Sequence, residues 1–345
     1  MKTTVVEEKG TTAVLSSPGR EASLTGGPAI RKEADACSRS SLRLKSILLP
    51  IDFSGPSLSG LEFAVALAHQ FGARITLLHV TEPVGLPDFA NSFRLIMQHD
   101  KVIAACKEQL EGLIKQYCVD AKVVGDVLVR EGRSFHEITE AARSLRSDII
   151  VMATHGYTGL RHTLLGSTAE RVVRHSPCPV LVVRQRQECE AKSPGGMGKI
   201  LVPIDFSEGS EKALDYTRLL AERNSAEVTL IHVVAPIPYY GQGDSGIFGY
   251  GVSEPDYAAM EAAMRAQSSI ELCSLAREEM ARGVSTTTLV RTGYPAIEIV
   301  ERARNWPADL IVISTHGRTG LGHVFLGSVA EQVVRRAPCS VLVVR

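Results

Sequence analysis

The chain alternates short apolar runs with longer stretches whose apolar residues recur at helical spacing. Short runs rich in Val, Ile and Leu predict buried strands, and apolar residues three and four positions apart predict helices. In the first half we expect strands at 47–51, 75–80, 121–129, 148–152 and 180–183. Helices are expected between them, at 58–71, 93–117, 135–145 and 167–175, with Ser134 as the N-cap of the third. Strands that are apolar throughout are buried on both faces, so the alternation predicts an open, parallel α/β sheet with helices on both faces.

The same pattern returns in the second half of the chain. Residues 47–54 read ILLPIDFS and residues 200–207 read ILVPIDFS, at an offset of 153. Aligned without gaps, 128–184 and 289–345 agree at 34 of 57 positions, at an offset of 161. Such self-similarity is the signature of a duplicated unit. The chain therefore holds two copies of one unit, and the second copy carries extra residues in its middle, near 239–255.

Two segments have no counterpart in the repeat. Residues 1–44 are rich in Ser, Thr, Gly and charge and show no sustained period, so they predict a mobile N-terminal arm. Residues 185–198 contain Ser-Pro-Gly-Gly and predict a linker. The two expected domains are therefore 45–184 and 199–345.

Composition narrows the class of protein. Hydrophobic residues make up 44% of the 345 residues, which is enough to build buried cores. Lys plus Arg and Asp plus Glu both number 38, and this zero balance argues against a nucleic-acid binder. No apolar run approaches the roughly 18 residues of a membrane helix, and no signal-peptide pattern opens the chain. The seven cysteines include no C-x-x-C pair. We expect a cytoplasmic protein that binds neither nucleic acid nor membrane.

The first loop with candidate chemistry follows the first strand of each copy. It reads PIDFS and places Pro50 and Asp52 in the first copy and Pro203 and Asp205 in the second. In an open parallel sheet the ligand crevice lies beyond the carboxyl ends of the strands. A carboxylate there can accept hydrogen bonds from sugar hydroxyls or purine donors, or help to hold a metal. The alternative is that the Asp and Ser of this loop only cap the following helix.

The second such loop follows the fourth strand. It reads ATHG or STHG, then nine residues, then Gly-Ser at the start of a helix. Glycine lets the backbone approach a phosphate, and the free N–H groups of a helix N-terminus favour an anion. The alternative is a turn that is rich in glycine only for packing. The candidate residues are Ala153, His155, Gly156, Gly166 and Ser167 in the first copy and Ser314, His316, Gly317, Arg318, Gly327 and Ser328 in the second.

Several other motifs are absent from the sequence. It holds no G-x-x-x-x-G-K-[ST] P-loop, no G-x-G-x-x-G after the first strand, no G-x-S-x-G and no H-E-x-x-H. His155 and His316 lack acidic or cysteine partners at metal-ligand spacing, so we expect loop or phosphate contacts from them and no role as a base. His79 and His232 lie on apolar strands and are expected in the core or at the edge of the crevice. No catalytic residue is predicted, and the sequence does not decide whether a metal site exists or which residues would form it.

These residues together resemble the universal stress protein family. The resemblance rests on PIDFS after the first strand, LLHV at 77–80, the THG…GS loop and PCPVLVVR at 177–184, and it covers both copies. The chain is similar to a tandem member with two such domains. The resemblance implies two repeated five-stranded parallel sheets in the order 3-2-1-4-5. It also implies a stress-response role and binding of ATP or AMP, with or without Mg²⁺, and no established reaction.

The family's nucleotide motif, G-x-x-G-x9-G-[ST], can be placed on this sequence. Its positions fall on Ala153, Gly156, Gly166 and Ser167, so alanine replaces the first glycine; in the second copy Ser314 replaces it. A methyl or hydroxymethyl group there narrows the site where the nucleotide would pass. The resemblance further implies a binding role for Asp52 and Asp205, and contact between adenine and the backbone of Val80 and Val233.

The sequence leaves three functions open. The leading hypothesis is a stress-response protein that binds an adenine nucleotide as a sensor or signalling module. A protein-interaction scaffold with an empty pocket is the alternative, its partner being another protein or a second copy of the chain. A slow ATPase is disfavoured because no base or catalytic lysine follows from the sequence.

Two differences along the repeat lead to further expectations. The copies should bind unequally, because Arg318 stands where the first copy has Tyr157 and Arg161 stands where the second has Gly322. The insert 239–250, rich in Gly and Tyr, could fold over a ligand as a lid; the alternative is an ordinary flexible surface loop. The last strands, 180–184 and 341–345, are apolar sheet edges, which proteins normally cover. We expect them to pair with each other as a pseudo-dimer; the alternative is two independent domains on a flexible linker.

Overall fold

The computed structural model describes residues 42–82, 92–117, 122–154, 165–184, 196–236, 254–315 and 326–345. Most of the predicted arm and linker lies outside the described residues, and so does the insert 239–250. The same holds for the candidate loop residues His155, Gly156, Tyr157, Arg161, His316, Gly317, Arg318 and Gly322. The described ranges contain the strand ends and helix starts that flank these loops.

Strands and helices alternate in both halves. The first half contains β1 (Ser46–Pro50), α1 (Gly55–Phe71), β2 (Arg74–Thr81), α2 (Ser92–Gln116), β3 (Val124–Glu131), α3 (Ser134–Ser144), β4 (Ile149–Ala153), α4 (Ser167–His175) and β5 (Val180–Val183). The second contains β6 (Lys199–Pro203), α5 (Glu208–Asn224), β7 (Glu227–Val234), α6 (Glu254–Ala281), β8 (Ser285–Thr292), α7 (Pro295–Asn305), β9 (Leu310–Ser314), α8 (Ser328–Arg336) and β10 (Ser340–Val344).

The elements predicted for the first half are all present, most of them with shifted ends. The bounds predicted for α4 and β5 match, whereas β3 begins three residues later than predicted. The prediction for Ser134 was wrong: it is the first residue of α3, and Arg133 is the N-cap and makes no side-chain capping bond. The reason is that the Ser134 hydroxyl donates to Glu82, at the end of β2, instead of accepting from the turn that follows.

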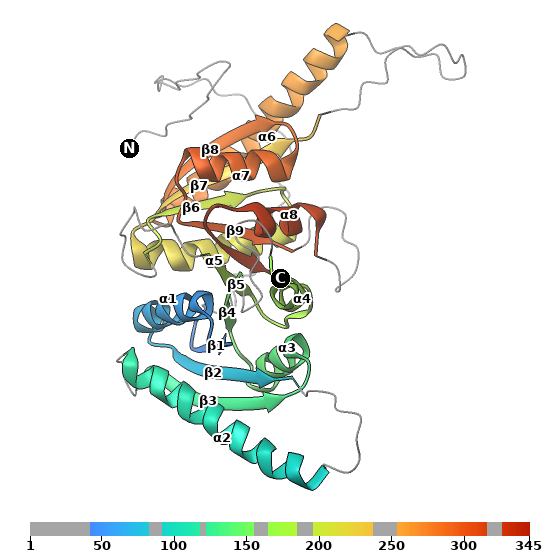
Figure 1. Cartoon of the computed structure of the whole chain (residues 1–345). Coiled ribbons are helices and arrows are strands. Elements are labelled where there is room, and N and C mark those ends of the chain that lie inside the picture. Colours follow the sequence, from blue (N-terminus) through green and yellow to red (C-terminus); the bar gives the residue numbers. More distant parts are fainter. Residues whose placement is uncertain are drawn as a thin grey trace, which may run out of the picture.

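The strands form one continuous sheet in the order β3-β2-β1-β4-β5-β10-β9-β6-β7-β8. The first five confirm the predicted order 3-2-1-4-5, and the last five repeat it in reverse. Within each half the strands are parallel, but β5 and β10 pair antiparallel, with Leu342 opposite Leu181. The predicted pairing of the two last strands is therefore confirmed, and it joins the halves into a single ten-stranded sheet (Figure 1).

Helices cover both faces of this sheet. One buried cluster packs α1, α2, α5 and α6 on one face, and a second packs α3, α4, α7 and α8 on the other. Successive strand residues alternate between the two clusters: Ile47 and Leu49 belong to the first and Leu48 to the second. This alternation follows from the two-residue period of a strand, and it explains why the strands read as uninterrupted apolar runs.

Polar contacts at the junction of the halves follow the approximate two-fold symmetry. The Arg184 guanidinium donates to the carbonyls of Val334 and Arg335, each at 3.1 Å, at the end of α8. Arg345 donates in the same way to Arg174 O at the end of α4. A cation at a helix C-terminus interacts favourably with the helix dipole and satisfies unpaired carbonyls. The two terminal arginines therefore fasten each half to a helix of the other.

Candidate functional site

The loop after β1 is held in an unusual backbone conformation in both halves. Phe53 has φ 61° and the equivalent Phe206 has φ 60°, in the left-handed region that non-glycine residues rarely adopt. The Phe53 ring packs against His79 with 4.7 Å between centroids, and His79 Nδ1 lies 2.7 Å from Ile51 O. Such strain persists where surrounding contacts fix it. His79, predicted to lie in the core or at the crevice edge, thus fixes the loop that carries Asp52.

Asp52 and Ser54 divide two tasks between them. Ser54 is the N-cap of α1 and accepts from Ser57 N–H at 3.3 Å. Asp52 Oδ1 accepts from the Ser54 N–H at 3.0 Å and from its hydroxyl at 2.6 Å. Among the described residues no partner reaches Asp52 Oδ2, which is available as an acceptor at the strand end. Capping by Ser54 and a ligand role for Asp52 are therefore compatible.

The end of β4 and the start of α4 are bound directly to each other. The Gly166 N–H donates to Thr154 O at 2.8 Å, and in the second half the Gly327 N–H donates to Thr315 O at 2.8 Å. A Cβ on Gly327 would lie 2.9 Å from Thr315 O, so this close approach needs glycine. Neither Gly166 nor Gly327 makes a side-chain capping bond. Within the described part of the chain, the first N–H groups of α4 and α8 therefore have no capping side chain.

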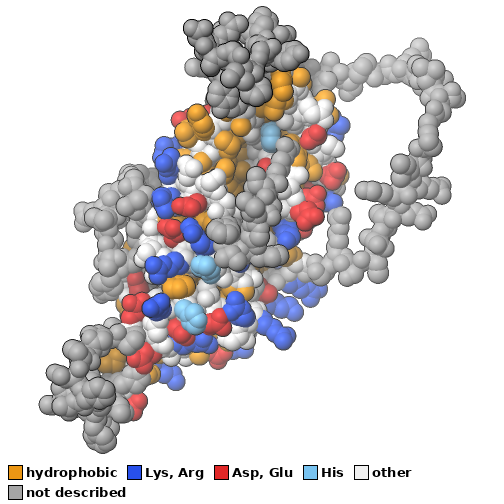
Figure 2. Space-filling view, turned by 90° about the vertical axis from the view of Figure 1, so that its right-hand side faces the viewer, with side chains coloured by type: hydrophobic (Ala, Val, Ile, Leu, Met, Phe, Trp, Pro, Cys, Tyr) orange, Lys and Arg blue, Asp and Glu red, His pale blue; other side chains and the backbone are white. Residues whose placement is uncertain are grey.

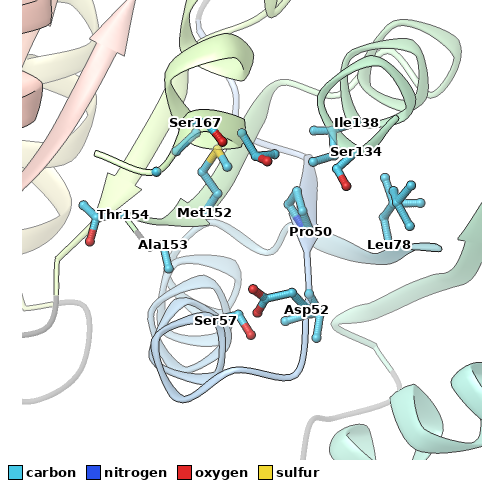
Figure 3. Close-up of a pocket in the computed structure, with 15 residues that line it drawn as sticks. Pro50, Asp52, Ser57, Leu78, Ser134, Ile138, Met152, Ala153, Thr154 and Ser167 are labelled. Carbon is cyan, nitrogen blue, oxygen red and sulfur yellow. The ribbon is translucent and has the colours of Figure 1, made fainter. Parts of the chain in front are cut away.

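A cavity of about 210 Å³ lies at this edge of the first half. It is bounded by the ends of β1, β2 and β4 and by the first turns of α3 and α4 (Figure 3). Six residues predicted from the sequence line it: Pro50, Asp52, Val80, Ala153, Gly166 and Ser167. The predicted residues His155 and Gly156 lie outside the described residues. The structure thus brings together every described first-half candidate.

Other lining residues were not predicted. They are Ile51, Ser57, Leu78, Ser134, Ile138, Met152, Thr154, Thr168 and Ala169. Leu78 lies two positions before Val80 on the same face of β2, so the strand period would have indicated it. Ser134 gave no such signal, because the sequence does not show that the start of α3 faces the ends of β1 and β2.

The second-half candidates occupy the matching positions. Pro203 and Ser314 end β6 and β9, Val233 is the penultimate residue of β7, and Gly327 and Ser328 open α8. Asp205 Oδ1 accepts from the hydroxyls of Ser207 and Ser210. In the first half the Ser57 hydroxyl, equivalent to Ser210, donates instead to Ser54 O at 2.9 Å. The two aspartates therefore have different hydrogen-bond environments.

Ser134, which lines the first-half cavity, binds the carboxylate of Glu82. Glu82 Oε1 accepts from the Ser134 hydroxyl at 2.8 Å and from the Ser134 N–H at 3.3 Å. The hydroxyl bond, and after it the backbone bond, lowers the pKa of Glu82 below its usual value. Glu82 is therefore ionised at neutral pH and accepts both bonds.

The described ranges contain neither a metal-binding cluster nor a membrane-spanning helix. No group of three or more His, Cys, Asp or Glu side chains there is placed to hold a metal ion. No helix within those ranges is both long enough and apolar enough to cross a bilayer.

Known proteins resemble the chain over most of its length. A model of the universal stress protein family matches residues 43–184 and 197–345. A universal stress protein of Mycolicibacterium smegmatis is 27% identical over 317 residues, which cover 87% of this chain and 96% of that protein. One from Methanocaldococcus jannaschii is 35% identical over 147 residues, which cover 43% of this chain and 81% of that protein.

A solved structure agrees with the fold. The crystal structure of a universal stress protein from Archaeoglobus fulgidus matches with a TM-score of 0.60 and 20% identity, covering 88% of this chain and 97% of that one. At this identity the match bears on the fold alone. The family model, in contrast, matches two segments that together cover most of the chain, so the chain belongs to the universal stress protein family, which supports a role in the stress response.

Proposed function

We propose that the chain binds an adenine nucleotide, ATP or AMP, at the carboxyl edge of the sheet in each half, and acts in the cytoplasm as a sensor or signalling module. One observation carries the proposal. The first-half cavity combines an acceptor, Asp52, at one end with the uncapped N-terminus of α4 at the other. A nucleotide has the complementary arrangement, with hydroxyl and amino donors at one end and an anion at the other.

The walls between these ends suit a flat heteroaromatic base. Pro50, Leu78, Val80, Ile138 and Met152 contribute apolar surface from three strands and a helix. Ligand sites are commonly apolar clefts with a few placed polar groups that fix orientation. In this arrangement the base lies against the apolar wall and Asp52 accepts from the sugar hydroxyls or the base.

The phosphates would lie at the start of α4. Ser167 is exposed there and Gly166 is half-buried, so an anion has access to both. The free N–H groups and the positive end of the helix dipole attract negative charge. The cavity volume of about 210 Å³ is below the roughly 300–1,000 Å³ of typical ligand pockets. We therefore assign the cavity to base and sugar, with the phosphates extending along α4.

A magnesium ion fits this arrangement only as a partner of the phosphates. Mg²⁺ is commonly held by one or two carboxylates together with phosphate oxygens and water. The cavity offers one carboxylate, Asp52. Because Asp52 lies at the sugar end of the cavity in this arrangement, a magnesium ion would be held by the phosphates and water, and the cavity does not form a metal site alone.

In this function the site binds the nucleotide without turnover. No titratable side chain other than Asp52 lines the described cavity, and the Asp52 carboxylate already accepts two bonds from Ser54. A general base needs a proton within reach and a suitable pKa. Because β5 and β10 pair, the two halves share one continuous sheet; we propose that they act as a pseudo-dimer, in which binding in either half affects this shared sheet.

Two measurements on the full chain test the proposal. Absorbance and mass spectrometry of the purified protein should detect bound ATP or AMP. Calorimetric titration with each nucleotide, with and without Mg²⁺, should show saturable binding. A protein that carries no nucleotide and gives no binding heat with either one contradicts the proposal and favours the scaffold alternative.

A further inference from the structure

Ser134 faces the first-half cavity with its hydrogen-bonding direction already fixed. It lines the cavity at the start of α3 (Figure 3), and both of its donors are used on one partner. Its hydroxyl donates to Glu82 Oε1 at 2.8 Å and its N–H donates to the same oxygen at 3.3 Å. A carboxylate can only accept, so the proton of the hydroxyl must lie on the Glu82 side.

This arrangement determines what Ser134 offers to a ligand. A hydroxyl has one donor and two acceptor lone pairs, and here the donor is already bound to Glu82. Toward the cavity Ser134 Oγ is therefore an acceptor. An N–H group of a ligand would be bound, whereas a carbonyl oxygen in the same place would meet a second acceptor and lose its hydrogen bond to water.

The second half lacks both members of the pair. Ala235 stands at the position of Glu82, and Pro295, the first residue of α7, stands at the position of Ser134. Proline has neither hydroxyl nor N–H. Beside it, Tyr294 is 70% exposed where the first half has the exposed Arg133. On the face shown in Figure 2, apolar side chains gather over the second half and charged ones over the first.

We infer that Ser134 is a specificity-determining residue of the first-half site, which Glu82 positions so that it accepts from the exocyclic amino group of a 6-aminopurine and disfavours a 6-oxopurine. The inference rests on the proposed function, since it concerns the same cavity. It also assigns different selectivities to the two halves: the first half distinguishes adenine from hypoxanthine by this contact and the second half does not.

The test compares ATP with ITP, which carries an oxo group in place of the amino group. Calorimetry is done on the full chain with Ser328→Glu, which places a carboxylate at the exposed start of α8 and leaves the first-half site to be measured. We expect a preference for ATP on the order of tenfold or more, because sites built around a hydrogen bond reject analogues that leave it unpaired. In the matched control, Ser167→Glu, only the second-half site remains. There the ratio of ATP affinity to ITP affinity should be close to one.

Variants of the pair then separate selectivity from folding. Ser134→Ala should bring the ratio of the first-half site close to one, and Ser134→Thr, which keeps a hydroxyl, should retain the preference. Glu82→Gln should reduce the ratio, because an amide can donate to the serine and free its proton for the ligand. Equal melting temperatures across the set would show that the fold is intact.

The outcomes distinguish this inference from the proposed function. Binding of ATP and ITP with a ratio that Ser134→Ala leaves unchanged would overturn the inference and leave nucleotide binding in place. Equal selectivity in the two single-site proteins would do the same. Absence of binding for both nucleotides in the unsubstituted chain would overturn the proposed function itself.

Discussion

The junction of the two halves allows a quantitative prediction from one pair of leucines. Leu181 on β5 and Leu342 on β10 are directly opposite in the antiparallel ladder, and they are 2% and 1% exposed. Replacing a buried leucine by alanine typically costs about 2–5 kcal/mol of unfolding free energy, through lost transfer energy and the cavity left behind. Each single variant should lose stability in that range.

The double variant is more informative. If the two side chains are neighbours, the first replacement already removes part of what the second would remove. Contacting residues deviate from additivity by about 0.5–3 kcal/mol, so Leu181→Ala/Leu342→Ala should lose less than the sum of the single losses by an amount in this range. A control pair, Leu181→Ala with Leu78→Ala on β2, has two strands between its members and should be additive within about 0.5 kcal/mol.

The assay is urea unfolding followed by two probes. Trp306 is the only tryptophan of the sequence and lies in the second half. Its ring centroid is 5.4 Å from the Lys199 ammonium and 5.3 Å from the Arg302 guanidinium. Its fluorescence reports on that half, and circular dichroism reports on both. Coincident transitions support a two-state treatment. If the Leu181→Ala and Leu342→Ala losses of unfolding free energy add as fully as those of the control pair, the pairing of β5 with β10 is refuted.

Three further predictions concern the junction and the first loop. Deleting 341–345 removes four valine and leucine side chains that are at most 1% exposed, each worth roughly 1.5–3 kcal/mol; light scattering should show aggregation or a new dimer, and a soluble, equally stable monomer would count against the account. Burial raises the pKa of Cys178 to about 11 from 9.0, so the unfolding free energy should fall by about 2 kcal/mol as the pH rises from 9 to 11. In Cys178→Ser the unfolding free energy, measured by chemical denaturation, should fall less over the same pH range. An unchanged pH dependence would contradict the raised pKa of Cys178. Ser54→Ala removes the cap of α1 and should cost about 1 kcal/mol in the same assay, against no measurable change for Ser167→Ala, whose side chain caps nothing.

The sequence predicts most of the fold because local and global signals agree in each half. The limits of α4 follow from Gly166 before it and Pro177 after it. Because the unit is duplicated, the pattern that predicts each element occurs twice in the sequence. The pairing of β5 with β10 could be predicted because an apolar edge strand needs cover. The resemblance to the family contributed the strand order, which the apolar periodicity alone leaves open.

The parts that could not be predicted depend on contacts distant in sequence. Ser134 and Glu82 are 52 positions apart and meet only because β2 and β3 pair and α3 follows β3. The left-handed Phe53 gives no sequence signal, because phenylalanine has no preference for positive φ; His79 compensates from the neighbouring strand. Arg184 reads as the end of an apolar strand, yet its guanidinium binds the last turn of a helix in the other half.

The number of ATP molecules bound per chain tests most directly whether each half binds an adenine nucleotide at the start of its fourth helix. Calorimetry should give two for the unsubstituted chain, one each for Ser167→Glu and Ser328→Glu, and none for the double variant, since a carboxylate at an exposed helix N-terminus repels phosphate without disturbing the helix. Equal melting temperatures would show that all four proteins are folded. Binding of ATP by the folded double variant with the affinity of the unsubstituted chain would contradict the account.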